Sequence, residues 1–218
     1  MAITVIPELG SSWPSTLKVT YNANGLNLAE GETSGIRIDS KGRLITTQEK
    51  RATYSAACVN LAIAAAGTDF FTITGSASKT IIVKRIRFSA SSSTTVQSNI
   101  GLCRRSTANT GGTSTTLTNV KHDTTNSPAT AVVRAYTANP TLGTLVEYLR
   151  WIDYTSMAPS SNSPTDIREF AFGIEEDQGI ILRGLNEVLA LNFNEQTVTF
   201  GAGVGYNLSV EWREIVGG

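Results

Sequence analysis

The sequence is short of the residues that carry most enzyme chemistry. Its 218 residues include one histidine, His122, and two cysteines, Cys58 and Cys103. One histidine and two separated cysteines cannot form the usual ligand set of a zinc site. Asp123 follows His122 directly, so on a strand their side chains would point to opposite faces and could not act together. We predict that His122 is a loop residue, that there are no catalytic, metal or cofactor-binding residues, and that the chain is not an enzyme.

Charged residues are also scarce. They make up 17% of the chain, and the 18 basic and 18 acidic residues cancel. No basic run is longer than a pair, which leaves no footprint for nucleic acid. No apolar run approaches the roughly 18 residues of a membrane span, and the N-terminus lacks the basic segment of a signal peptide. We expect a soluble protein, made in a cytoplasm, with neither nucleic acid nor membrane as a partner.

The cysteines show no metal-binding spacing. We expect Cys58 and Cys103 to be buried thiols that pack as small apolar side chains. A disulfide between them would require neighbouring strands, which sequence spacing does not show.

Three other features resemble sites but have simpler explanations. Residues 201–205 are rich in glycine, yet they lead into a strand rather than a helix, which indicates a turn rather than a phosphate loop. The acidic run 175–177 lacks the spacing of a calcium loop and is interpreted as a solvated turn. A glycosidase needs two facing carboxylates, but no spacing supports such a pair among Glu147, Asp153, Glu169 and Glu187.

What the chain has in quantity is strand patterning. In the closing segment, 179–214, one face of a clear alternation consists of Tyr206, Leu208, Val210 and Trp212. Trp212 therefore belongs to the core. We expect the same of Trp151, which leaves Trp13 as the only tryptophan available to stack on a sugar.

Further strands are expected at short intervals from residue 52 onward. Val59, Leu61 and Ile63 should share one face, and residues 96–104 and 167–174 form later strands. In the long strand 80–88 the apolar phase changes, and a bulge near Lys84 and Arg85 would restore one buried face.

Segment 142–154 fits both a helix and a strand. We choose a strand, because its neighbours are strands. The count of eight to ten strands predicts an all-β, antiparallel β-sandwich of the jelly-roll type.

The first 50 residues are organised differently. Residues 1–35 contain few core-forming residues, so we expect an extended arm that docks on a surface; the alternative is a floppy terminus. Residues 35–47 predict a β-hairpin, and 48–51 a linker. We divide the chain into 1–50, arm plus hairpin, and 51–218, the sandwich. The residues expected to contact other proteins are Trp13, Leu17, Val19, Ile36, Ile38 and Leu44.

Four stretches resemble segments of structural proteins of tailed bacteriophage virions. They are residues 35–44 (GIRIDSKGRL), 68–75 (TDFFTITG), 121–143 (KHDTTNSPATAVVRAYTANPTLG) and 181–193 (ILRGLNEVLALNF). The likeness covers most of residues 35–215. It implies a jelly-roll protein without enzymatic activity, assembled in several copies, often trimers, on a capsid or tail. It brings no functional residues with it.

These observations together predict a capsid decoration, or cement, protein located on the virion and assembled in the host cytoplasm. Its partners would be copies of itself, as a homotrimer, and the major capsid protein or other virion proteins. The main alternative is a tail or head-fibre component that binds a glycan through loops 106–118 and 157–165. A glycan hydrolase is the third reading.

Overall fold

A computed structural model shows how the chain is divided. There are two units, Met1–Lys50 and Arg51–Gly218. In the second unit the structure describes residues 52–63, 68–93, 95–158, 167–173, 178–193 and 204–216. In the first unit it describes the backbone of two short strands. Throughout these residues the regular secondary structure is β-strand.

The N-terminal unit contains the predicted hairpin. β1 (Arg37–Ile38) pairs antiparallel with β2 (Leu44–Ile45), with Arg37 opposite Ile45 and Ile38 opposite Leu44. This part of the fold prediction is confirmed. The predicted arm, with Trp13, Leu17 and Val19, lies outside the described residues, as do Ile36 and the side chains of Ile38 and Leu44.

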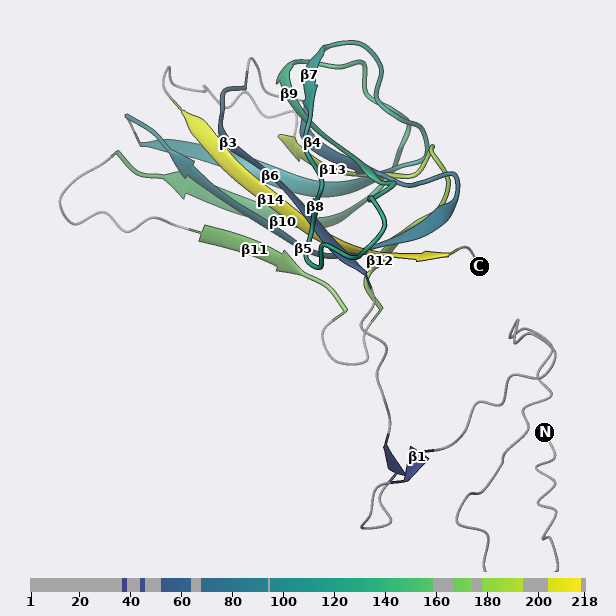
Figure 1. Ribbon diagram of the computed structural model, residues 1–218. Helices are drawn as coiled ribbons and strands as arrows, with labels where there is room; N and C mark the ends of the chain where they lie inside the picture. The colour runs from purple at the N-terminus through teal and green to yellow at the C-terminus, as the bar shows by residue number, and fades with distance from the viewer. Residues whose placement is uncertain are drawn as a thin grey trace, which may run out of the picture. The chain divides into compact units, whose positions relative to one another are not determined.

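The second unit is a β-sandwich of two antiparallel sheets (Figure 1). The first, which we call the β6 sheet, has the order β10 (Leu145–Ser156), β6 (Val96–Arg105), β13 (Val188–Phe193), β4 (Asp69–Thr74), β9 (Val132–Ala138), β7 (Thr113–Thr116). The second, the β5 sheet, has the order β11 (Ile167–Ala171), β5 (Lys79–Ser91), β14 (Gly205–Val216), β3 (Thr53–Leu61), β8 (Val120–Lys121). β12 (Ile180–Leu182) also pairs with β5.

The strand pairing is that of a jelly roll. If the short strands β7, β8 and β12 and the added strand β9 are set aside, eight strands remain in chain order: β3, β4, β5, β6, β10, β11, β13 and β14. The first pairs with the last, the second with the seventh, the third with the sixth and the fourth with the fifth. This nested antiparallel order defines the jelly roll and confirms the predicted fold class.

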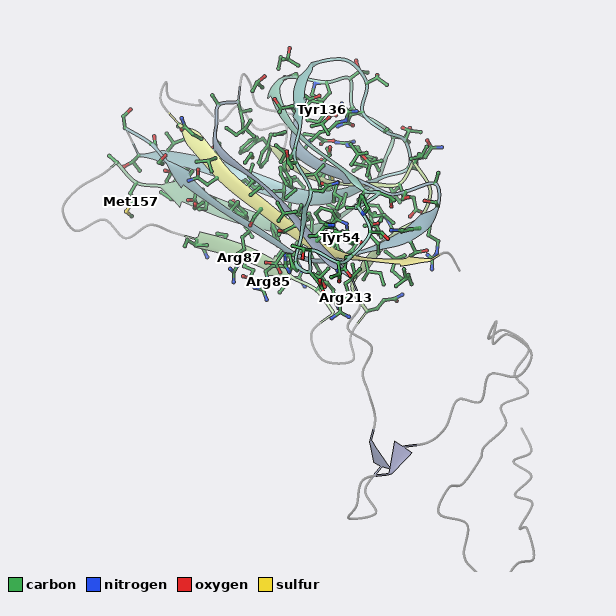
Figure 2. The ribbon with its side chains drawn as sticks, viewed as in Figure 1. Tyr54, Arg85, Arg87, Tyr136, Met157 and Arg213 are labelled. Atoms are coloured by element: carbon green, nitrogen blue, oxygen red, sulfur yellow. The ribbon has the colours of Figure 1, made fainter. Side chains whose placement is uncertain are left out.

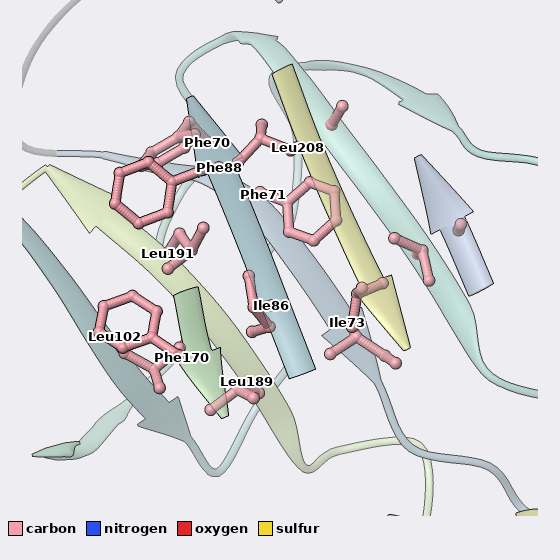
Figure 3. Packing of buried hydrophobic residues seen from close by; sticks show 14 of the residues in the cluster. Phe70, Phe71, Ile73, Ile86, Phe88, Leu102, Phe170, Leu189, Leu191 and Leu208 are labelled. Carbon is pink, nitrogen blue, oxygen red and sulfur yellow. The ribbon is translucent and has the colours of Figure 1, made fainter. Parts of the chain in front are cut away.

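The core fills the space between the sheets (Figure 3). As the alternation predicted, Tyr206, Leu208, Val210 and Trp212 are all buried. Aromatic rings pack within this core on neighbouring strands of one sheet: Trp212 and Tyr54 of the β5 sheet stack with ring centroids 5.9 Å apart, and Phe70 and Phe193 of the β6 sheet lie at 4.1 Å. Burial of large apolar and aromatic surface is the main term that holds the two sheets together.

The bulge predicted in the long strand is present in β5. Opposite β14, Arg85 pairs with Glu211 but Val83 pairs with Trp212, so Lys84 is one extra residue on β5. The extra residue returns the apolar side chains after it to the core, because side chains alternate faces along a strand. Ile81, Val83, Ile86 and Phe88 are accordingly all buried.

A second bulge, in β3, overturns one prediction. Between the pairs Leu61 with Tyr206 and Cys58 with Leu208, β3 has one more residue than β14. Asn60 there adopts a positive φ of 57°, a left-handed conformation that asparagine tolerates better than most residues. Val59 is thereby turned outward and is 81% exposed. It does not share a buried face with Leu61.

Segment 142–154 is a strand, as chosen, but Trp151 was placed wrongly. In β10, Ile152 pairs with Ile100 and Tyr154 with Ser98, on the core side. Trp151 is out of phase with both and therefore lies on the outer face, 40% exposed.

Candidate functional site

The residues considered for catalysis have local structural roles. His122 lies exposed in the turn after β8, and its backbone N–H donates to the Thr53 carbonyl (3.0 Å). The Asp123 carboxylate accepts hydrogen bonds from the backbone and hydroxyl of Thr125, at 2.9 and 2.7 Å, which hold this turn. Within the described residues no group of three or more His, Cys, Asp or Glu side chains could hold a metal ion.

The candidate carboxylates are distributed over different elements. Glu169, on β11, pairs with Arg85 at 3.5 Å and with Arg87. Glu187 lies 3.6 Å from Arg104. The other two, Glu147 and Asp153, are on β10. The acidic run 175–177 and residues 201–203 lie outside the described residues, and Gly205 begins β14.

A buried polar network fastens loops to the outer face of the β6 sheet. The fully buried Asp69 carboxylate accepts two hydrogen bonds from Arg105, 2.5 and 2.7 Å, in a bidentate pair. It accepts two more, from the side-chain amides of Asn109 (2.8 Å) and Asn192 (2.7 Å). Arg105 also donates to the Gly143 carbonyl at 2.8 Å. Charge-assisted bonds of this kind offset the cost of burying both charges, so this network is structural.

The second buried carboxylate is Glu214, near the end of β14. It accepts hydrogen bonds from Trp212 Nε1 (3.0 Å), from the backbone of Thr130 and Ala131 (2.8 and 3.0 Å), and from Lys79 Nζ (3.1 Å). Burial alone would raise the pKa of Glu214, but the hydrogen bonds from Trp212, Ala131 and Thr130 outweigh it and lower the pKa below its ordinary value. Glu214 thus ties β14 to the segment before β9.

Both cysteines are free thiols on different sheets. Cys58 is on β3 and Cys103 on β6. Burial raises the pKa of Cys58 to about 11. Burial, helped by the negative charge of Asp69, raises the pKa of Cys103 to about 12. The prediction of two free thiols is confirmed, although Cys58 is only partly buried. The alternative, a disulfide between them, is wrong.

An aromatic pair, an exposed Trp151 and a half-buried Tyr148, lies on the outer face of the β6 sheet, at its β10 edge. We call Tyr148 and Trp151 the aromatic platform; their ring centroids are 4.2 Å apart and their planes 32° from parallel. Trp151 pairs with Gly101 of β6, and a Cβ at Gly101 would lie 2.6 Å from Cζ3 of Trp151. On the same face, Asn99 donates a hydrogen bond to the Asp153 carboxylate at 2.6 Å.

The sequence contained a signal for this platform. Trp151 and Asp153 fall on one face of the alternation, and Ile152 and Tyr154 on the other. Asp153 marks the first face as the exposed one.

Exposed apolar side chains gather on the same edge strand. Among the described residues nine large apolar side chains are exposed, and five of them are Leu142, Leu145, Val146, Trp151 and Met157, on or beside β10. The outer face of the β5 sheet is different, since it carries Arg85, Arg87 and Arg213 (Figure 2) with Glu169 and Glu211. Antiparallel sheets often face water on one side; exposed apolar side chains along such an edge strand indicate binding.

The loops proposed for sugar recognition are only partly described. Loop 106–118 includes β7, and of 157–165 only Met157 and Ala158 are described. In the described part of the chain, no helix is long and apolar enough to cross a membrane.

The described residues thus offer one distinctive surface for binding, at the β10 edge. No protein-family model, curated protein or solved structure matches the chain.

Proposed function

We propose that this chain is a non-enzymatic structural protein of a virus particle, of the decoration type, which binds the assembled shell and stabilises it. One observation carries the proposal. The jelly roll is complete without the first unit, because β3 starts at Thr53 and pairs with the last strand, β14. We infer that residues 1–50 serve to contact another protein.

The sequence of this first unit suits such a contact. Its apolar residues, too dispersed to build a core, are candidates to dock on a neighbour: Trp13, Leu17, Val19, Ile36, Ile38 and Leu44. The resemblance of residues 35–44 to virion proteins supports the same role. Binding that favours the assembled shell stabilises it by mass action, and repetition over the lattice adds many modest interfaces.

The buried charges also support a structural role. Asp69 and Glu214 are each engaged by several donors that hold loops onto the sheets. Neither carboxylate is left for proton transfer in the described structure. A rigid body of this kind is suited to repeated packing on a surface.

Shell binding is the direct test. The full chain and a 51–218 variant are added separately to tailed-phage shells assembled without the protein. Bound copies are counted, and the shells are then heated. We expect saturable binding in multiples of the shell symmetry and a raised disruption temperature with the full chain, and binding at least tenfold weaker with the folded 51–218 variant. Absence of binding to shells would contradict the function, and equal binding of the variant would contradict the role of the first unit.

The proposal includes self-association. We expect a homotrimer, which sedimentation equilibrium of the full chain measures directly. A monomer at every concentration would remove this part of the proposal and leave shell binding intact.

A further inference from the structure

We propose that the aromatic platform is a carbohydrate-binding site. A pyranose ring would pack on the exposed part of the Trp151 indole beside Tyr148, with a hydroxyl group bound by Asp153, which Asn99 holds in place. The proposal does not depend on where on a particle the protein sits, and so it stands apart from shell binding.

The strand register places these groups on one surface. Trp151 lies opposite Gly101, and Asp153 opposite Asn99, in consecutive outward positions of β10 and β6. Consecutive outward positions on a strand are about 7 Å apart. A sugar ring on Trp151 therefore has its rim within reach of the Asp153 carboxylate.

Gly101 and Tyr148 hold the tryptophan in position. Because Gly101 has no Cβ, the Trp151 ring lies directly against the backbone of β6. The Tyr148 ring lies against the same ring, tilted by 32° and at 4.2 Å between centroids. Trp151 nevertheless keeps 40% of its surface exposed. A binding surface fixed before the ligand arrives loses little conformational entropy on binding.

The polar groups beside the rings suit hydroxyl groups. Asn99 Nδ2 donates to one oxygen of the exposed Asp153 carboxylate. A carboxylate has a second oxygen with its own lone pairs, and among the described residues Asp153 has no ion-pair partner. That oxygen can accept hydrogen bonds from sugar hydroxyls. Apolar rings next to a carboxylate match a sugar, which has an apolar C–H face and a polar rim.

A protein is the competing occupant. Leu145 and Val146, 42% and 55% exposed, extend the apolar surface along β10 away from Asp153. The centres of protein interfaces, however, are depleted of charged residues. The carboxylate beside Trp151 therefore favours the sugar.

The experiment uses the full chain and an array of neutral oligosaccharides built from glucose, galactose, mannose and N-acetylhexosamines. Hits are titrated by isothermal calorimetry, which does not depend on the residue replaced, and tryptophan fluorescence is recorded for the native chain and for D153N. We expect W151A to weaken binding by about tenfold or more, and D153N to weaken it while leaving the fluorescence of Trp151 in place. W151F should keep part of the affinity. I167A is the matched control, because Ile167 is an exposed apolar residue on β11, the edge strand of the other sheet.

The possible results of this experiment lead to different conclusions. Saccharide binding that falls in W151A and D153N but not in I167A, with thermal unfolding unchanged in all three, supports the site. Binding that W151A leaves intact overturns it, as does the absence of any saccharide ligand. Loss of shell binding or of self-association in W151A, without saccharide binding, would overturn it in favour of a protein interface.

Discussion

At the scale of single residues, the buried Glu214 carboxylate is held by several hydrogen bonds. Its oxygens receive hydrogen bonds from Lys79, Thr130, Ala131 and Trp212, which come from three parts of the chain. If the carboxylate is replaced, the buried donors around it lose their acceptor. A buried donor left without an acceptor costs more free energy than its hydrogen bond contributed.

We predict that Glu214→Gln lowers the free energy of unfolding by about 3 kcal/mol. Urea denaturation at neutral pH measures this. Glu211→Gln is the control, because Glu211 lies on the outer face and its contact with Arg85, at 4.0 Å, is partly exposed; it should change stability by less than about 1 kcal/mol. Equal effects of the two substitutions would contradict the structural role of Glu214.

The lowered pKa of Glu214 also sets a pH dependence. Its pKa in the folded state is below that of the unfolded chain, about 4.3. The stability it contributes is therefore fully present above the unfolded value and is lost as pH falls through the folded value. Between pH 7 and pH 2 the free energy of unfolding should fall less steeply in Glu214→Gln than in the native chain. An equally steep fall in both proteins would contradict this assignment.

The cysteines give a third prediction at this scale. With pKa values raised to about 11 and about 12, Cys58 and Cys103 are protonated thiols at pH 8, and the thiolate is the reactive form. A thiol-specific reagent at pH 8 should label the native protein very slowly and label two thiols per chain after denaturation without reductant. Fast labelling of the native protein, or no thiol after denaturation, would contradict this.

At the scale of elements, two bulges decide which side chains reach the core. The bulge in β5 could be predicted, because the apolar phase changes visibly between Val83 and Ile86. The bulge in β3 could not. It depends on a positive φ at Asn60, whose backbone N–H also donates to Asn207 Oδ1 at 2.9 Å. That contact spans most of the chain and leaves no periodic signal.

Deletion of Lys84 should prevent folding. Without the extra residue, the two halves of β5 could not both direct their apolar side chains into the core. Either Ile86 and Phe88 or the apolar residues before them would turn to the outer face of the β5 sheet. Lys84→Ala keeps the register and should cost no more than about 1 kcal/mol. Circular dichroism and thermal unfolding of both variants measure the difference. A cooperatively folding deletion variant would show that the bulge does not set the register.

At the scale of the whole molecule, the first and last strands of the sandwich pair with each other. Thr53 at the start of β3 pairs with Arg213 of β14, and β14 also pairs with β5 along its length. The contacts that close the fold are thus far apart in the sequence, which predicts slow folding for a domain of this size. The two described strands of the N-terminal unit, β1 and β2, pair with each other.

This arrangement predicts opposite effects of two truncations. Removal of residues 1–50 should leave the denaturant midpoint of the sandwich unchanged within error. Removal of 205–218 should abolish cooperative unfolding, since β3 and β5 both lose their partner strand. Urea titrations followed by far-ultraviolet circular dichroism compare them, because the second variant lacks Trp212 and both variants retain β-strand signal. A large loss of stability in the first variant would show that the two units are energetically coupled.

The sequence by itself determined the fold class, because period-two alternation in residues such as Tyr206 to Trp212 reports directly on which face is buried. It also determined the N-terminal hairpin and the need for a bulge near Lys84, since both are local signals. Tertiary structure alone decided the outward turn of Val59 and the buried network around Asp69. It also decided the meeting of Tyr148, Trp151 and Gly101 on one surface. These features depend on contacts between strands distant in the sequence, and a local pattern does not encode its partner.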